Sequence, residues 1–281
     1  MNGMLELLIA PFVICLILTG IHCYLGIHIV SRGVIFVDLA LAQVAALGST
    51  VALLAGYELG SNETYLISLG FTFFGAAIFA LGRIRDESVP QEAIIGIVYA
   101  VSSAAAILVL DKAPHGEDAI KAMLVGSILY VTWPQIIKIS VIYFVIAILH
   151  FLLRKRFLMI SMNPALARQN GLWIRFWDFI FYITFGVIVT SSVRIAGVLL
   201  VFSYLVVPAV CAMFFVRNVL HRLIIGWSLG FIASVLGLYA SAKWDFPTGA
   251  SVVTVFGLIL VVCAVLKYAL NRREIVQIKV N

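Results

Sequence analysis

The feature that most constrains this chain is a series of nine apolar segments, each close to the length of helix that crosses a bilayer. Of the 281 residues, 63% are hydrophobic and 11% are charged. A soluble domain carries about 25% charged residues, and a disordered chain has far lower hydrophobicity. Both classes are therefore excluded, and the sequence predicts an all-α bundle of transmembrane helices.

The segments give the expected order of the bundle, with eight spans as the alternative count. A crossing helix needs about 20 predominantly apolar residues. A tenth apolar stretch, Ile120–Val131, is too short to span and predicts an interfacial or re-entrant helix. The nine expected spans are Leu5–Leu25, Gly33–Ala55, Tyr65–Leu81, Gln91–Leu110, Trp133–Leu153, Phe176–Val193, Ile195–Val216, Ile224–Tyr239 and Thr248–Tyr268.

Lysine and arginine indicate the orientation, because short cytoplasmic loops carry an excess of both. With the N-terminus outside, 14 of the 19 basic residues fall in inner gaps. The outer gap Gly56–Thr64 then contains Glu58 and Glu63 but no basic residue. We therefore expect an N-out, C-in topology. The five basic residues on the outer side would be Lys112, Lys121, Lys138, Arg194 and Lys243.

No gap between the spans is long enough for a second domain, so residues 1–281 are expected to form one transmembrane domain. The longest inner gap, residues 154–175, has 22 residues. The sequence contains no phosphate-binding Walker loop, no dinucleotide-binding glycine motif and no His-Glu-x-x-His. We expect no covalent chemistry in this chain, and any ATP hydrolysis would need a separate subunit.

The inner gap 154–175 contains a short segment with helix signals at both ends. Asn163 is a good N-cap, and Pro164 follows at the first helical position, where its missing N–H costs nothing. Asn170 and Gly171 are typical of a helix C-terminus, where the backbone adopts the left-handed conformation. The segment is either an ordinary interfacial helix or a knob that docks onto a partner. The docking residues would be Asn163, Pro164, Ala165, Leu166, Ala167 and Arg168.

The second span carries two polar residues, Asp38 and Gln43. At 1.5 Å per residue they lie roughly 8 Å and roughly 15 Å from the inner end, so Gln43 is near the midplane. An ionisable group at this depth should face the protein interior. Asp38 shares one helical face with the small residues Ala42, Ala45 and Ser49, which favours close helix packing. Asp38 is either a structural carboxylate or part of a path for a polar or cationic substrate.

Glu92 lies at the start of the fourth span. Ser88 and Gln91 form a candidate capping box, which places Glu92 in the first helical turn. A carboxylate is favoured there by the helix dipole, and this structural role suffices to explain it. The alternative is a cation exit site near the cytoplasm.

The seventh span contains Gly197 and Pro208. Pro208 removes a helical hydrogen bond in the middle of the span and predicts a kink. Kinked helices line transport paths in many carriers, and they also occur as packing defects, so the sequence leaves both open. The five histidines show no pair at i, i+4 spacing, and we assign none of them as a metal ligand.

Six segments together resemble a known family, the integral-membrane permeases of ATP-binding-cassette (ABC) importers for zinc and manganese, called the ABC-3 type. The segments follow the family order from residue 33 to residue 250, which is most of the chain. They are Val34–Gln43, Glu92–Ile97, Met123–Leu129, Asn163–Arg168, Val193–Val201 with Pro208 and Ala209, and Pro247–Ala250.

The resemblance implies a homodimeric or heterodimeric permease in the bacterial inner membrane. A pair of ATPase subunits would dock below it, and an extracytoplasmic metal-binding protein would dock above. Asn163–Gly171 would be the coupling helix. The resemblance implies no cofactor bound by this chain, because the metal ion is cargo and ATP belongs to the partner.

The sequence departs from the family pattern at two positions. The coupling-helix motif commonly begins with Asp, and Asn163 stands there; both residues cap a helix. Members of the family often carry His near the position of Gln43. An amide oxygen binds zinc less well than an imidazole does, so the identity of the metal is open.

We therefore expect the permease subunit of an importer for a divalent transition metal, zinc or manganese first, with iron as a third candidate. Asp38, Gln43 and Glu92 would lie on the translocation path, and Gly197 and Pro208 would shape a bent helix beside it. Two alternatives stay open. One is an ABC permease for an iron chelate or another small cofactor, and the other is a stand-alone secondary carrier that uses Asp38 as an ion site.

Overall fold

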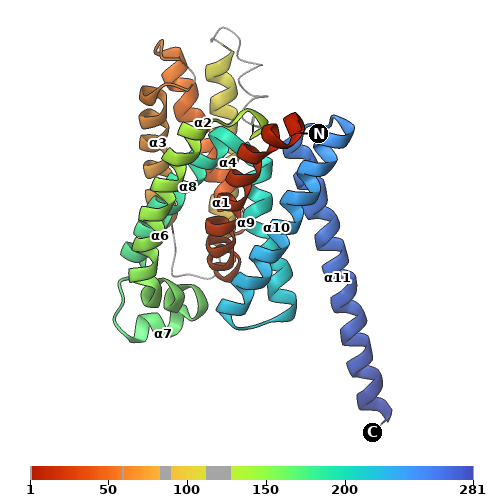
Figure 1. Ribbon diagram of the computed structural model, residues 1–281. Coiled ribbons are helices and arrows are strands. Elements are labelled where there is room, and N and C mark those ends of the chain that lie inside the picture. Colours follow the sequence, from red (N-terminus) through yellow and green to blue (C-terminus); the bar gives the residue numbers. More distant parts are fainter. Residues whose placement is uncertain (1, 59, 83–89, 112–127, 281) are drawn as a thin grey trace.

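The structure, a computed structural model, describes residues 2–58, 60–82, 90–111 and 128–280, with side chains described between residues 8 and 271 of these ranges. Within them the elements are all helical (Figure 1). They are α1 Asn2–Arg32, α2 Val37–Leu54, α3 Asn62–Leu81, α4 Gln91–Leu110, η1 Ile128–Tyr130, α6 Trp133–Met162, α7 Pro164–Gln169, α8 Ile174–Ala196, α9 Val198–Phe215, α10 Val219–Trp244 and α11 Thr248–Val280.

In the described part of the chain, nine helices are long and apolar enough to cross a membrane, which confirms the expected transmembrane bundle. Several helices extend beyond the apolar segments. α6 continues to Met162 through Arg154, Lys155 and Arg156, and α11 continues past the bundle in Figure 1. Hydropathy marks the part of a helix inside the bilayer, whereas lysine and arginine sustain a helix in water.

The tenth apolar stretch, Ile120–Val131, lies mostly outside the described residues. Its last part forms the single 3-10 turn η1. Ser88 of the candidate capping box, like Met123–Ser127 of the resembling segments, also lies outside them.

Two groups of helices meet at α1 (Figure 1). α2 packs against α3, α4 and α8, while α9, α10 and α11 pack on one another. α1 contacts α9 and α10 on one side and α6 on the other, and α6 also contacts α8. The bundle therefore has α1 near its centre.

Small residues allow the closest helix crossings. A Cβ added to Gly26 of α1 would lie 1.8 Å from the carbonyl oxygen of Leu205 in α9. A Cβ added to Gly48 of α2 would lie 2.8 Å from the Cα of Ser68 in α3. In lipid, where no hydrophobic force drives helices together, such close backbone contact is a main source of association energy.

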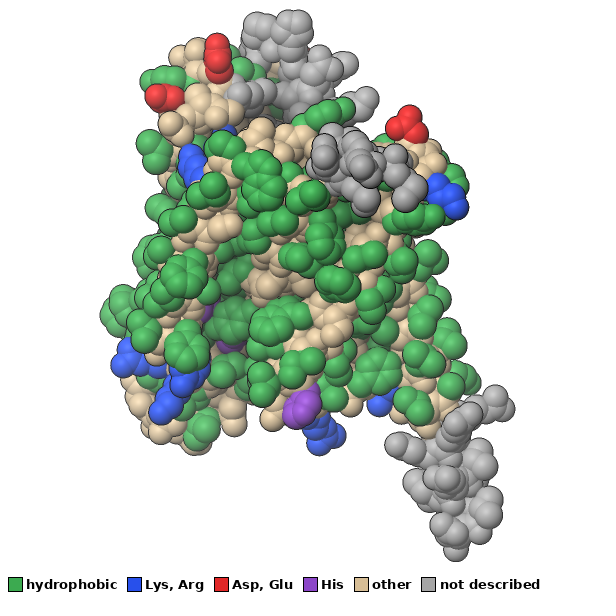
Figure 2. Space-filling model, viewed as in Figure 1, with side chains coloured by type: hydrophobic (Ala, Val, Ile, Leu, Met, Phe, Trp, Pro, Cys, Tyr) green, Lys and Arg blue, Asp and Glu red, His purple; other side chains and the backbone are tan. Residues whose placement is uncertain are grey.

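Figure 2 shows a band of apolar side chains around the middle of the molecule. Most of the basic side chains visible in this view gather at the end that carries α7, and the acidic ones lie at the opposite end. In the orientation expected from the sequence, the end that carries α7 would be the cytoplasmic one.

Candidate functional site

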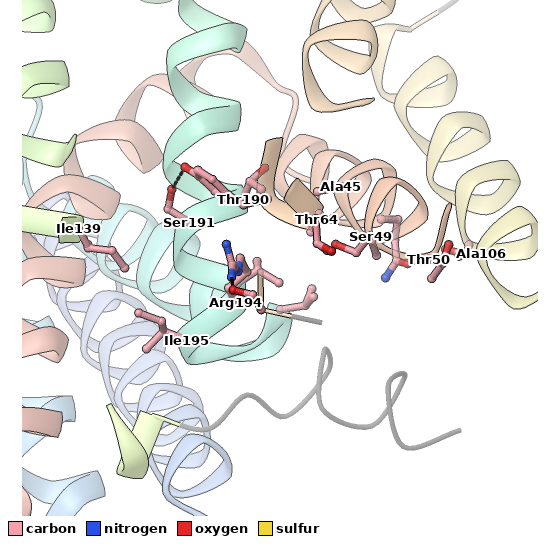
Figure 3. Close-up of a pocket in the computed structure, with 18 of the residues that line it drawn as sticks. Ala45, Ser49, Thr50, Thr64, Ala106, Ile139, Thr190, Ser191, Arg194 and Ile195 are labelled. Atoms are coloured by element: carbon pink, nitrogen blue, oxygen red, sulfur yellow. Dashed lines mark hydrogen bonds between the residues drawn. The ribbon is translucent and has the colours of Figure 1, made fainter. Parts of the chain in front are cut away.

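A pocket of about 550 Å³, called the outer pocket after the expected orientation, is lined by residues of α2, α3, α4, α6, α8 and α9 (Figure 3). One wall is the small-residue face of α2, where Ala42, Ala45 and Ser49 line the cavity together with Gln43. Small side chains at these positions leave the space open. Three residues of the face recognised in the sequence, though not Asp38, therefore line a cavity. Six helices contribute its walls, and Gln43 is half-buried in its lining.

Neutral oxygen atoms dominate the polar lining of this pocket. Within the described residues the lining includes no carboxylate, imidazole or thiol, and no group of three or more such side chains occurs elsewhere in that part of the chain. Amide and hydroxyl oxygens can coordinate a hard cation or hydrogen-bond to its water shell, but they do not neutralise its charge. The polar lining side chains are Gln43, Ser49, Thr50, Thr64, Tyr65, Tyr99, Ser103, Gln135, Thr190 and Ser191, together with the cationic Lys138 and Arg194.

The two cationic side chains flank Tyr65 of α3. The Arg194 guanidinium lies 5.0 Å from the centre of the Tyr65 ring, and the Lys138 ammonium lies 5.4 Å from it. Arg194 also donates a hydrogen bond of 2.8 Å to the carbonyl oxygen of Gly60. The Tyr65 hydroxyl is 2.8 Å from that of Ser191. These contacts connect the outer ends of α3, α6 and α8.

Asp38 and Glu92 come together at the inner end of α2 and α4. α2 begins at Val37 after the turn at Gly33, so Asp38 lies in its first turn, and it is 2% exposed. Glu92 lies close enough to act electrostatically on Asp38. One carboxylate oxygen of Glu92 accepts a 3.0 Å hydrogen bond from the Phe36 amide. Each carboxylate keeps one buried oxygen without a hydrogen-bond partner.

This geometry separates the three residues expected on the path. Gln43 lines the outer pocket, whereas Asp38 and Glu92 lie outside its lining and interact electrostatically with each other. Two neighbouring carboxylates of like charge disfavour each other's ionised form, and a cation bound near them would offset this cost.

A buried polar cluster between α1, α6 and α8 was not assigned a role from the sequence. Arg32 and Asp178 form a 2.7 Å ion pair in it. His28 contacts the Ser161 hydroxyl at 2.8 Å, and His150 contacts that of Thr184 at 2.8 Å. The available signal was Asp178, an acidic residue inside an apolar segment, but its partner lies 146 residues away in sequence.

The inner gap forms the short helix α7. The side chain of Asn163 accepts a 3.0 Å hydrogen bond from the Leu166 amide, as expected of an N-cap, and Gly171 has a φ of 71°. Ala167 is buried against the ends of α6 and α8, while Leu166 is 43% exposed. α7 is thus anchored by one face and presents the other to solvent.

Of the two residues expected to shape a bent helix, Gly197 lies between the lining residues Ile195 and Val198, whereas Pro208 is not part of the lining. α8 ends and α9 begins at Gly197, whose φ of 77° favours glycine. α9 continues as one helix through Pro208. The helical structure near the outer pocket is therefore interrupted at Gly197, one residue before the pocket residue Val198.

Comparison with known proteins identifies the family. The model described as "ABC 3 transport family" matches residues 4–267. The chain belongs to the ABC 3 transport family. This confirms the resemblance seen in the sequence.

Curated relatives of this ABC 3 chain have low identity over most of its length. The manganese transport system membrane protein MntC of Listeria monocytogenes is 24% identical over 233 residues, covering 82% of this chain and 80% of the relative. A probable iron transport system membrane protein of Haemophilus influenzae is 26% identical over 254 residues, covering 90% and 88%. The manganese import permease ScaB of Streptococcus gordonii is 25% identical over 266 residues, covering 91% and 88%.

A solved structure supports the fold. PsaBC from Streptococcus pneumoniae in complex with a Fab superposes with a TM-score of 0.76 at 19% identity, covering 92% of this chain and 90% of that chain. Membership of the family and nine candidate spans make this chain a multi-pass membrane permease.

Proposed function

We propose that this chain is the permease subunit of an ABC importer that moves a divalent transition metal into the cytoplasm, with manganese or iron as the first candidates. The observation that carries the proposal is the family match over residues 4–267. The printed functions of the relatives, manganese and iron transport, support these two metals.

The chemistry of the path favours manganese over zinc. Its described groups that could coordinate a metal are hydroxyl, amide and carboxylate oxygens, with Gln43 in place of an imidazole. Oxygen ligands suit manganese, whereas zinc prefers imidazole and thiolate ligands. In this mechanism the ion passes Gln43 in the outer pocket and then reaches Asp38 and Glu92, about 7.5 Å further along α2.

ATP hydrolysis would occur on a separate pair of subunits that dock against α7. Movement of α7 would be transmitted to α6 and α8, because Ala167 is buried against both. An extracytoplasmic metal-binding protein would deliver the cargo to the outer pocket, and a second permease copy or paralogue would complete the dimer.

Uptake of labelled manganese, iron and zinc tests the proposal in cells with and without the gene. We expect loss of manganese or iron uptake in the cells that lack it. Uptake should stop when ATP is depleted and continue when a protonophore is added with ATP maintained. Equal uptake of all three metals by both strains would refute metal transport, and protonophore-sensitive uptake would favour the secondary carrier.

A further inference from the structure

The buried polar cluster between α1, α6 and α8 contains four side-chain atoms that have no hydrogen-bond partner within the described residues. They are Tyr24 Oη, His28 Nε2, Arg32 Nη2 and His150 Nδ1. All four atoms are buried, and the side chains of His28, Arg32 and His150 are at most 2% exposed. A buried polar atom without a partner is costly, so four of them in one cluster indicate a bound ligand.

The ring of Tyr24 connects the members of this cluster. Its centre lies 4.8 Å from that of the His28 ring and 5.6 Å from that of the His150 ring. His150 acts electrostatically on His28, and the Arg32 guanidinium acts on both imidazoles. The Phe181 ring lies beside the two imidazoles, at 5.6 Å and 5.7 Å between ring centres. The four atoms therefore belong to one site bordered by an aromatic side chain.

The contacts of His28 place a hydrogen on its unpartnered nitrogen. Arg32 donates from Nε to the Ser161 hydroxyl oxygen at 2.8 Å, which leaves the hydroxyl hydrogen for another acceptor. His28 Nδ1 lies 2.8 Å from the same oxygen and is the acceptor found among the described residues. In a neutral imidazole the other nitrogen then carries the hydrogen. His28 Nε2 is therefore a buried donor without an acceptor.

The contacts of His150 lead to the opposite assignment. The Thr184 hydroxyl donates to backbone carbonyl oxygens of its own helix, those of Ile180 and Phe181, at 3.0 Å and 2.9 Å. Its oxygen therefore accepts from His150 Nε2, which lies 2.8 Å away. With the hydrogen on Nε2, the lone pair of Nδ1 is a buried acceptor without a donor. The cluster thus offers a donor on one imidazole and an acceptor on the other.

Charge and hydrogen-bonding capacity select the ligand. A metal cation would be repelled by Arg32, and the hydrogen assigned to His28 Nε2 leaves one imidazole lone pair to bind it. An anion would meet no net positive charge, because the Asp178 carboxylate lies 2.7 Å from the Arg32 guanidinium. Water is neutral, donates two hydrogen bonds and accepts two, and buried water typically makes about three. Water therefore fits the cluster better than either ion.

We propose that an enclosed water molecule occupies this cluster. It accepts a hydrogen bond from His28 Nε2 and donates one to His150 Nδ1, while Tyr24 Oη and Arg32 Nη2 supply its remaining partners. Water bridges of this kind are nearly as favourable as direct hydrogen bonds. The water completes a hydrogen-bonded chain that runs from α1 through α6 to α8.

The chain adjoins the anchor of α7. The His150 ring lies 4.7 Å from the Phe157 ring, and the Phe157 ring lies 6.2 Å from that of Trp177. Trp177 packs against the cluster of residues that includes the buried Ala167. The water therefore lies in the junction that connects α1 with the two helices that hold α7. The inference goes beyond the proposed function, because it depends on no particular cargo.

The sign of a stability change tests this inference in the full-length chain in lipid nanodiscs. In a dry cluster the Tyr24 hydroxyl is buried without a partner, so Tyr24→Phe should raise the melting temperature. With the water present, the same substitution removes a hydrogen bond. We therefore expect the melting temperature of Tyr24→Phe to fall by roughly 2–4 °C.

Two other tyrosines calibrate this measurement. Tyr204→Phe removes a hydrogen bond of 2.7 Å with Ser234, so its melting temperature should fall. Tyr268→Phe removes a hydroxyl from a side chain that is 71% exposed, so its melting temperature should stay the same. The direct measurement is cryo-electron microscopy of the assembled transporter at a resolution that shows ordered water. We expect density at about 2.7–3.2 Å from both His28 Nε2 and His150 Nδ1.

Either of two results would overturn the inference. One is a higher melting temperature for Tyr24→Phe, and the other is the absence of density between the two imidazoles. Density that disappears with a chelator would identify a metal ion, and density that strengthens when bromide replaces chloride would identify an anion. Both of these would also overturn it. None of the results changes the proposed function, since uptake in cells tests that separately.

Discussion

The guanidinium of Arg32 and the carboxylate of Asp178 lie 2.7 Å apart between α1 and α8, and both side chains are almost completely buried, at 2% and 0% exposed. Arg32 also donates to the Ser161 hydroxyl of α6 at 2.8 Å, and its guanidinium lies 4.0 Å from the Phe181 ring centre. One side chain therefore joins the inner ends of three helices.

Removing one partner of this ion pair should be strongly destabilising, because the other charge stays buried. We expect Arg32→Ala to lower the free energy of unfolding by about 3–5 kcal/mol. The double change Arg32→Met with Asp178→Leu should recover most of that loss. Thermal unfolding in detergent measures both. A single variant as stable as the wild type would show that water already reaches the pair.

Gly26→Ala should disturb the crossing of α1 and α9, because the new methyl group would overlap the carbonyl oxygen of Leu205. Overpacking of this kind costs about 1–3 kcal/mol, so the melting temperature should fall. Gly20→Ala is the matched control on the same helix, since nothing lies within 4 Å of its added methyl group. Equal melting temperatures for the two variants would contradict the close crossing.

Leu166→Asp should uncouple transport from ATP hydrolysis by weakening the contact with the ATPase subunits. It should not unfold the chain, because Leu166 is 43% exposed on α7. The combination with Gly171→Pro should add to the effect, since proline cannot adopt the φ of 71° found there. The readouts are ATP-dependent uptake and co-purification of the ATPase. Leu220→Asp, at an exposed position in the first turn of α10, is the control. Normal transport by the double variant would exclude docking at α7.

The orientation predicts that Asn62 is outside and Asn170 is cytoplasmic. Single cysteines at these positions can be introduced after the four native cysteines, all buried, have been replaced. An impermeant thiol reagent added to intact cells should label Asn62→Cys and leave Asn170→Cys unmodified. Permeabilised cells should show labelling at both positions. Equal labelling in intact cells would contradict the N-out topology.

The fold could be predicted from the sequence because a bilayer leaves few choices for the backbone. Long apolar segments must form helices there, since unpaired backbone groups are costly in lipid. The ends of helices could not be predicted in the same way. Arg154, Lys155 and Arg156 end the apolar segment but not α6, because all three are compatible with a helix in water.

The site was predictable only where one helix defines it. The face of Ala42, Ala45 and Ser49 follows from helical spacing, and it does line the pocket. The opposite wall does not follow, because Tyr65, Lys138 and Arg194 come from three helices whose packing no local pattern specifies. The approach of Glu92 to Asp38 likewise depends on the packing of α4 against α2.

Metal uptake by Asp38→Asn tests the central claim most directly, with the amount of folded permease measured in the same membranes. Asn keeps the shape of the side chain and removes the charge. If Asp38 serves the passing cation, uptake should be abolished while the melting temperature stays the same or rises, because a buried ionisable group is replaced by a neutral one. Uptake at the wild-type rate, or a loss of uptake matched by an equal loss of folded protein, would contradict a path that runs past Asp38.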